Sequence, residues 1–224
     1  MDWQSIGLTL RLSATTATIL LVLGVPLAFW LARTRNPLRP FIEAIVALPL
    51  VLPPTVLGFY VLLMLGPRSI LGGFYETITG SLLPFSFPGL VVGSVLFSLP
   101  FAVQPFTAGF RSVPRELEEA AWCLGESRRR TFWRVTIPQA RAGLWAGAVL
   151  AFAHTLGEFG VALMVGGNIA GVTRTVSISI YDSVQAMDYV TAGWTSALLL
   201  LGSFLILATL YFIQRKPISA WPGS

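Results

Sequence analysis

Residues 89–110, GLVVGSVLFSLPFAVQPFTAGF, are followed directly by residues 111–141, RSVPRELEEAAWCLGESRRRTFWRVTIPQAR. The first segment contains no Asp, Glu, Lys or Arg, and it has the length of about 20 residues that a helix needs to cross the hydrocarbon core of a bilayer. The second segment carries too many arginines and glutamates to be buried in lipid. This junction therefore predicts a transmembrane helix that ends in a water-exposed loop.

Four further apolar windows flank this junction. They cover approximately residues 8–31, 41–65, 144–165 and 191–213, so the chain has five windows of spanning length. Of all residues, 54% are hydrophobic and 11% are charged, whereas an ordinary soluble domain has about 25% charged residues. The sequence predicts an all-α integral membrane protein with five transmembrane helices in a single domain, residues 1–224.

The arginines are distributed unevenly between the loops, and short loops rich in Lys and Arg stay in the cytoplasm. Most basic residues lie in the loops after the first and third windows and in the C-terminal tail: Arg33, Arg35, Arg39, Arg111, Arg115, Arg128, Arg129, Arg130, Arg134, Arg141, Arg215 and Lys216. The alternate loops carry only Arg68 and Arg174. We expect the N-terminus outside and the C-terminus inside. This asymmetry accounts for most of the net charge of +5, so a nucleic-acid partner is not expected.

Residue counts exclude several classes of site. One Cys and one His leave no disulfide framework and no Cys/His zinc cluster. The single lysine, Lys216, is followed by Pro217 and has no glycine run before it, so a phosphate-binding P-loop is absent. We expect no catalytic residue, metal or cofactor in this chain. Five spans are also few to enclose a pathway, and a symmetric homodimer is the simplest source of a second wall.

The loop of residues 111–141 is long enough to form two short helices. Pro114 suits a first helical turn, close to the acidic residues Glu116, Glu118 and Glu119. One apolar face then follows at helical spacing, with Leu117, Ala120, Ala121 and Leu124, before Gly125 ends the helix. A second helix is expected from about Ser127 to Ile137, ended by Pro138. Such a hairpin suits a groove on another protein or the lipid headgroup layer, and the residues alone leave both open.

The run Glu119-Ala120-Ala121, with Gly125 and the later Ile137-Pro138, resembles the EAA loop of bacterial ABC-importer permeases. In that family this loop inserts into a cleft of a separate ATPase subunit. The resemblance implies that Glu119, Ala120, Ala121 and Gly125 couple this chain to such an ATPase, which would bind ATP and Mg.

Further stretches are similar to the molybdate permeases of that family, namely residues 48–58 (LPLVLPPTVLG), 156–160 (LGEFG), 167–169 (GNI) and 173–175 (TRT). Sulfate permeases share much of this pattern but are generally longer. The resemblance implies a multi-pass permease subunit of the bacterial cytoplasmic (inner) membrane, which works as a homodimer with two ABC ATPase subunits and an external oxyanion-binding protein. Molybdate is the expected cargo, with tungstate as its chemical twin. A sulfate or thiosulfate importer is the alternative.

Candidates for the translocation path or its gate lie inside the windows. Prolines free backbone carbonyls and bend a membrane helix. Pro49, Pro53 and Pro54, with Thr55, cluster in the second window, and Pro100 and Pro105 flank Gln104 in the third. We expect these segments to be broken, to line the path and to hinge as it opens.

Two ionisable residues, His154 and Glu158, are further candidates for the path or its gate. They lie four apart in the fourth window, so they are expected to share a helix face and could hydrogen-bond. Glu158 is assigned to helix packing or to an external gate. In the following loop, Asn168 and Arg174 are candidates for docking the external partner. A membrane scaffold or receptor is a competing class, but flexible, proline-broken spans argue against it; a membrane enzyme lacks a catalytic constellation.

Overall fold

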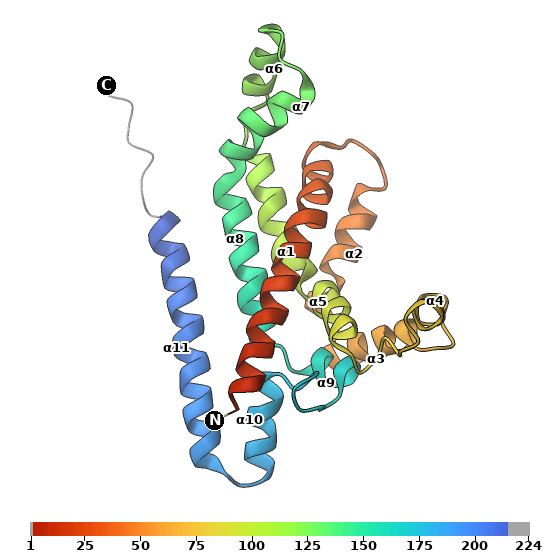
Figure 1. Cartoon of the computed structure of the whole chain (residues 1–224). Coiled ribbons are helices and arrows are strands. Elements are labelled where there is room, and N and C mark those ends of the chain that lie inside the picture. Colours follow the sequence, from red (N-terminus) through yellow and green to blue (C-terminus); the bar gives the residue numbers. More distant parts are fainter. Residues whose placement is uncertain (1, 215–224) are drawn as a thin grey trace.

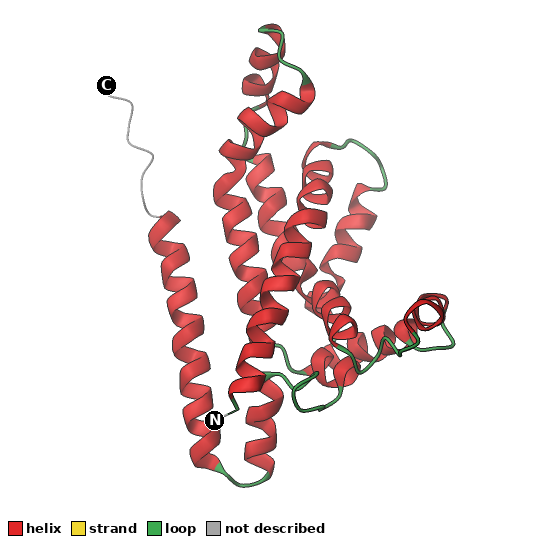
Figure 2. Cartoon of the chain, in the orientation of Figure 1, coloured by secondary structure: helices red, strands yellow, loops and turns green. Residues whose placement is uncertain are grey.

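The computed structural model describes residues 2–214, and these residues form helices without any strand, as the all-α prediction requires (Figures 1 and 2). In chain order the elements are α1 (Trp3–Arg33), α2 (Arg39–Val51), α3 (Pro54–Leu65), α4 (Ile70–Thr79), α5 (Phe87–Arg111), α6 (Arg115–Cys123), α7 (Arg128–Thr131), the π-helical turn η1 (Phe132–Thr136), α8 (Ile137–Leu156), α9 (Gly160–Gly166), α10 (Val176–Gln185) and α11 (Tyr189–Gln214). The basic tail residues Arg215 and Lys216, and the predicted location of the C-terminus, lie outside the described residues.

Three long helices, α1, α5 and α8, pack against one another and form the centre of the molecule (Figure 1). The core that they share includes Leu20, Phe106 and Phe110, whose side chains are at most 1% exposed. Glycines allow α5 and α8 to approach closely, because a Cβ atom added to Gly143 would lie only 2.6 Å from the Cα atom of Gly109. Small residues at helix contacts are the usual means of tight packing in membranes, where no hydrophobic effect drives helices together.

The five apolar windows do not all form continuous helices. Helices α1, α5 and α11 are each long and apolar enough to cross a membrane, whereas the second and fourth windows are bent pairs, with 116° between α2 and α3 and 64° between the α7–α8 helix and α9. Three of the described helices can therefore span by themselves, or up to five spans exist if each bent pair counts as one. The number of spans stays a prediction.

Helix α5 corrects one expectation about prolines. Pro100 and Pro105 lie inside this helix, yet it runs without a break from Phe87 to Arg111. The helix packs against α1, α8 and α9, and prolines are tolerated in membrane helices where neighbouring helices and local adjustments satisfy the freed backbone groups. The expected break in the third window is therefore wrong, whereas the break in the second window occurs at Leu52 and Pro53.

The loop of residues 111–141 forms the expected first helix but continues differently. Helix α6 starts after Pro114, and Gly125 follows it with φ of +83°, the left-handed conformation that glycine adopts without strain. The second helix begins after Ser127, as predicted, but it does not end at Pro138. It continues through η1 into α8, with Pro138 in the first turn of α8. The wider π-helical turn just before Pro138 accommodates a ring that would clash in a regular α-helix.

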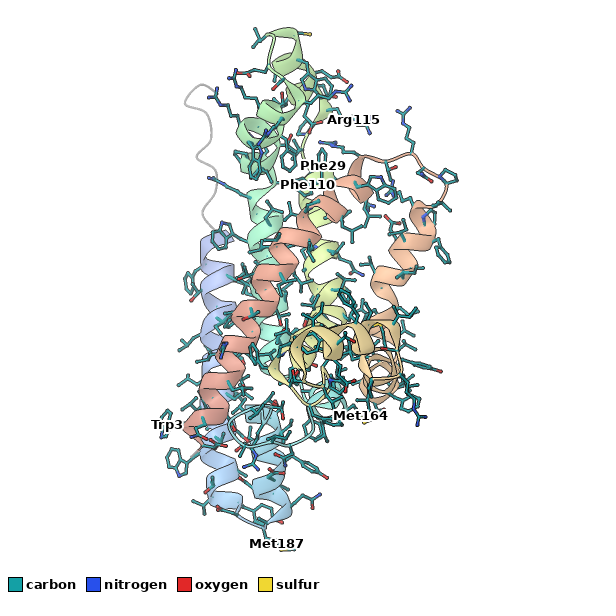
Figure 3. The ribbon with its side chains drawn as sticks, turned by 45° about the vertical axis from the view of Figure 1, so that its right-hand side comes forward. Trp3, Phe29, Phe110, Arg115, Met164 and Met187 are labelled. Carbon is teal, nitrogen blue, oxygen red and sulfur yellow. The ribbon has the colours of Figure 1, made fainter. Side chains whose placement is uncertain are left out.

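The two arginine-rich loops lie at the same end of the molecule, and the N-terminal end of α1 lies at the other (Figure 1). Figure 3 shows Phe29, Phe110 and Arg115 at the first end, and Trp3 and Met187 at the opposite end. We call these the α6 end and the outer end, respectively. The arrangement is the one that the charge asymmetry requires, although the membrane orientation itself stays a prediction.

Candidate functional site

The four residues of the EAA motif lie on or directly after α6, at the tip of the molecule (Figure 1). Glu119, Ala120 and Gly125 are exposed and Ala121 is half-buried. Trp122 is also exposed, and the guanidinium of Arg128 lies over its ring, at 5.6 Å from the ring centroid. The exposed surface of the helix therefore combines small side chains, the carboxylates of Glu116 and Glu119, and the ring of Trp122, which Arg128 partly covers.

Glu118 is the only residue of α6 that is buried, and its role was missed by the sequence analysis. Its Oε1 atom accepts hydrogen bonds from Arg33 Nη2 and from Thr136 Oγ1, each at 2.9 Å. Arg33 Nη2 also donates to the carbonyl of Val113 at 3.2 Å. The local sequence relates Glu118 only to the helix dipole, because no local spacing links it to a residue 85 positions earlier. We call Arg33, Glu118 and Thr136 the Glu118 cluster.

A cleft of about 550 Å³ opens beside the Glu118 cluster, between the end of α1, α6 and the α7–η1 segment. Its walls combine basic, acidic and aromatic side chains: Phe29, Arg33, Arg115, Glu118, Glu119, Trp122, Arg128, Arg129, Thr131, Phe132 and Thr136. Helix α6 forms one wall of this cleft, and the three residues of the Glu118 cluster belong to its lining.

The two helix breaks meet although they lie far apart in the sequence. A Cβ atom added to Gly160, at the start of α9, would lie 2.7 Å from Cβ of Pro54, at the start of α3. One added to Gly58 would lie 2.7 Å from Cβ of Met164. Helices α3 and α9 are thus packed face to face. The proline motif of the second window and the Gly-Glu-Phe-Gly motif of the fourth form one structural unit.

The α2–α3 break is exposed on the surface of this chain. Pro49 is buried, but Pro53, Pro54 and Thr55 are exposed, and the side chain of Val51 is 83% exposed. Gln104, on α5, is exposed as well. The sequence predicted that these residues lie at a path; the structure places Pro53, Pro54 and Thr55 together and leaves Gln104 on a separate helix.

His154 is held by α5. Its Nδ1 atom and the Ser98 hydroxyl are 3.0 Å apart, and Ser98 also hydrogen-bonds with Thr155 Oγ1 at 2.9 Å. The ring of Phe101 stacks on the imidazole, with 3.8 Å between the ring centroids. His154 therefore connects α8 to α5 through a polar contact within an otherwise apolar interface.

His154 and Glu158 share no hydrogen bond, and the expectation that they lie on one helix face is wrong. Helix α8 ends at Leu156, so the two residues do not lie on successive turns of one helix. Glu158 is only 3% exposed, and neither of its carboxylate oxygens has a hydrogen-bond partner among the described residues. A buried polar group without a partner is rare and marks a strained or functional position. Its place at the α8–α9 break keeps it a gate candidate.

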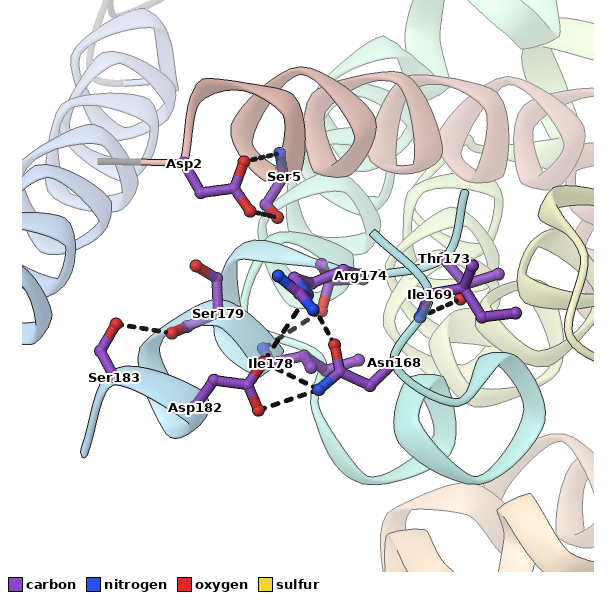
Figure 4. Close-up of polar contacts among 11 residues, drawn as sticks. Asp2, Ser5, Asn168, Ile169, Thr173, Arg174, Ile178, Ser179, Asp182 and Ser183 are labelled. Carbon is purple, nitrogen blue, oxygen red and sulfur yellow. Dashed lines mark hydrogen bonds and ion pairs between the residues drawn. The ribbon is translucent and has the colours of Figure 1, made fainter. Parts of the chain in front are cut away.

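A polar network at the outer end joins the two docking candidates to a third residue (Figure 4). Arg174 Nε donates to Asn168 Oδ1 at 2.6 Å, and Asn168 Nδ2 donates to both carboxylate oxygens of Asp182, at 2.9 and 2.8 Å. Arg174 Nε lies 3.6 Å from Asp182 Oδ2. Asn168 and Arg174 were predicted from the sequence, whereas Asp182, an acidic residue on the following helix α10, was not.

No group of three or more His, Cys, Asp and Glu side chains that could hold a metal ion occurs within residues 2–214. The candidate site of this chain is thus a set of protein contacts and helix breaks: the α6 surface at one end, the α3–α9 contact inside, and the Asn168–Arg174–Asp182 network at the outer end. Such an arrangement suits movement of helices against one another.

Comparison with known proteins gives concordant results. The family model described as binding-protein-dependent transport system inner membrane component matches residues 21–217. The chain is 50% identical to the molybdenum transport system permease protein ModB of Azotobacter vinelandii over 96% of this chain and 95% of that protein. It is 34% identical to the probable sulfate transport system permease protein cysT of Zygnema circumcarinatum over 93% of this chain and 72% of that protein. A solved bacterial ABC transporter involved in import of the polysaccharide alginate shares the fold, with a TM-score of 0.75 at 18% identity over 96% of this chain and 79% of that chain.

Proposed function

We propose that this chain, which belongs to the family of binding-protein-dependent transport system inner membrane components, is the permease subunit of an ATP-driven importer of molybdate. As a member of this family it is a transport component of the inner membrane and not itself an enzyme. The 50% identity to a molybdenum transport permease over nearly the whole of both chains is the observation that carries the cargo assignment. The fold alone would not do so, because the permease fold also occurs in an alginate transporter.

The translocation path is proposed to lie along the exposed α2–α3 break, opposite a second copy of the chain. A non-helical backbone at membrane depth is tolerated only where it is buried in protein or lines a water-filled cavity. The break at Leu52 and Pro53 lies inside the second apolar window, and Pro53, Pro54 and Thr55 are exposed. This surface therefore does not suit lipid. A homodimer would enclose it, with the α3–α9 contact moving as the path opens.

The exposed face of α6 is proposed to bind one ATPase subunit, so that the homodimer recruits two. Glu119, Ala120, Ala121 and Gly125 would enter the groove of that subunit, where Ala120 and Ala121 permit close approach. ATP and Mg would bind to the ATPase. Closure of the two ATPase subunits would draw the two α6 helices together, and the helices attached to them would tilt.

The outer end is proposed to receive an oxyanion-binding protein. Arg174 and Asn168 stand in an exposed hydrogen-bonded network, so their side chains are already ordered before a partner arrives. A pre-ordered polar surface loses less conformational entropy on docking than a flexible one. Specificity for the anion would reside largely in that binding protein.

A sulfate or thiosulfate importer is the second candidate, because a sulfate permease is also similar to this chain. Sequence identity favours molybdate, since the chain is 50% identical to the molybdenum permease but 34% identical to that sulfate permease. Tungstate has the same charge and geometry as molybdate and is expected to be transported as well.

The experiment that tests this function is reconstitution of the chain with its cognate ATPase and binding protein in liposomes. We expect ATP hydrolysis to rise with molybdate or tungstate but not with sulfate. Glu119→Lys should abolish this rise, whereas Glu76→Lys, the same substitution on an exposed residue of α4, should keep it. Stimulation by sulfate alone would support the second candidate. Failure to assemble with any ATPase would refute the importer assignment.

A further inference from the structure

The attachment of α6 depends on a single carboxylate. Every residue of this helix except Glu118 is exposed or half-buried, so its other side chains contribute little packing against the body. Glu118 binds Arg33, the last residue of α1, and Thr136, the last residue of η1. Without the Glu118 cluster, α6 would remain joined to the body mainly through its two flanking chain segments and its neighbours in the same hairpin.

The Arg33–Glu118 ion pair differs from the other ion pairs of this hairpin in its burial. Its side chains are 17% and 9% exposed, whereas those of Arg130 and Glu126 are 60% and 30% exposed. Separating a buried pair leaves an uncompensated charge in a poorly solvated place, so such a pair opens much less readily than a pair in water. The cluster is therefore expected to stay closed while α6 moves.

Thr136 extends the cluster to α8. It is 1% exposed and ends the π-helical turn from which α8 continues. Turns of this kind are rare and frequently occur at functional positions. Because its hydroxyl donates to Glu118, the first turn of α8 is fixed relative to α6.

Helix α1 connects the cluster with the outer end. It extends over 31 residues, which corresponds to about 46 Å at about 1.5 Å per residue. Near its start, Thr9 is 1% exposed and its Oγ1 atom accepts a hydrogen bond at 2.8 Å from the backbone N–H of Val176. Val176 is the first residue of α10 and lies two positions after Arg174 of the outer network. One helix thus contacts α6 through Arg33 and the outer loop through Thr9.

We propose that Glu118 and Arg33 make α1 the element that transmits movement between α6 and the outer loop of residues 167–175. On the proposed function, on which this inference rests, docking of the loaded binding protein shifts the outer loop and α1, and Arg33 passes this shift to α6 and the ATPase. In this proposal Glu118 and Arg33 are positioning residues, because they act through α1 and α6.

The test is a double-mutant cycle in the reconstituted transporter, with Arg33→Gln, Glu118→Gln and both together. We expect each complex to assemble and to keep its basal ATP hydrolysis, but stimulation by the molybdate-loaded binding protein should fall about fivefold or more. The double variant should be no worse than either single variant, since the two residues act as a unit. Glu43→Gln, which removes the more exposed ion pairs with Arg39 and Arg111 at the same end, is the matched control and should keep stimulation. Normal stimulation in both single variants, or effects that multiply in the double variant, would overturn the proposal.

Two milder substitutions at Thr136 test the cluster in case the charge-removing variants fail to assemble. Thr136→Val removes only the hydroxyl and should weaken stimulation, while Thr136→Ser keeps the hydroxyl and should preserve it. Equal stimulation in these two variants would contradict the role of the cluster.

Amide hydrogen exchange separates this proposal from the proposed function. If no loaded binding protein stimulates ATP hydrolysis by the wild-type complex, the proposed function is refuted, but the contribution of the Arg33–Glu118 contact can still be measured. Exchange across residues 115–123 should rise in Glu118→Gln and stay unchanged in Glu43→Gln. Unchanged exchange in Glu118→Gln would overturn the role of Glu118 by itself.

Discussion

The contact between Gly143 and Gly109 gives a prediction whose size follows from the structure. A Cβ atom added by Gly143→Ala would lie 2.6 Å from both the Cα atom of Gly109 and the carbonyl oxygen of Pro105. The shortest ordinary contact is 3.4 Å, so α5 and α8 would have to separate by about 0.8 Å. Both obstructing atoms belong to the backbone, and no flexible side chain can move away. We expect a cost near the upper end of overpacking, about 3 kcal/mol.

The assay is thermal unfolding of the detergent-solubilised permease, followed by loss of the monodisperse peak in size-exclusion chromatography. For a chain of this length the cost corresponds to a decrease in Tm of about 6–12 °C. Gly109→Ala should have a smaller effect, because its added Cβ atom would lie 3.0 Å from the nearest atoms. Gly202→Ala on α11 is the control, since nothing lies within 4 Å of the added atom. A Gly143→Ala variant that melts together with the Gly202→Ala variant would refute the reasoning.

Three further predictions concern the helix breaks and the start of α11. Glu158→Gln removes a buried carboxylate that has no partner among the described residues, and we expect slower molybdate uptake by proteoliposomes; wild-type uptake with unchanged Tm would exclude both a gate and a packing role. Gly160→Ala would place a Cβ atom 2.7 Å from Cβ of Pro54 and should slow uptake severalfold while the binding protein still docks; unchanged uptake would show that the α3–α9 contact does not take part. The pKa of Asp188 is lowered because its carboxylate accepts hydrogen bonds from Thr191 at the start of α11. This contact therefore stabilises α11 at pH values above the ordinary pKa of 3.8, and the stabilisation is lost as the pH falls through the lowered pKa. Asp188→Asn should remove that part of the pH dependence of Tm, and identical Tm profiles of the two proteins between pH 3 and pH 7 would contradict this.

Helix α6 shows how much of the site was predictable from local sequence. The acidic first turn, the apolar spacing and Gly125 are all local signals, and the helix observed from Arg115 to Cys123 follows them. The exposure of Glu119 and Ala120 also agrees with the expected surface for a partner. Whether these residues bind an ATPase stays a prediction.

The errors concern residues whose behaviour depends on distant neighbours. The proline rule predicted breaks in the third window and after Ile137, but packing by α1 and α8 keeps α5 continuous and a π-helical turn accommodates Pro138. The helical spacing of His154 and Glu158 assumed one continuous helix, which ends at Leu156. The three errors thus have different causes, namely packing by neighbouring helices, a π-helical turn and the end of a helix, and the local rules contain none of them.

The sequence by itself determined that this chain is a helical membrane protein, which loops carry the positive charge, and where the EAA helix lies. The physical reason is that lipid forces apolar runs of a set length into helices, and this requirement acts on each segment separately. Only the tertiary structure decided that Glu118 binds Arg33 and that Pro54 meets Gly160. Such contacts join residues far apart in the chain, and they depend on how whole helices pack, which no local spacing encodes.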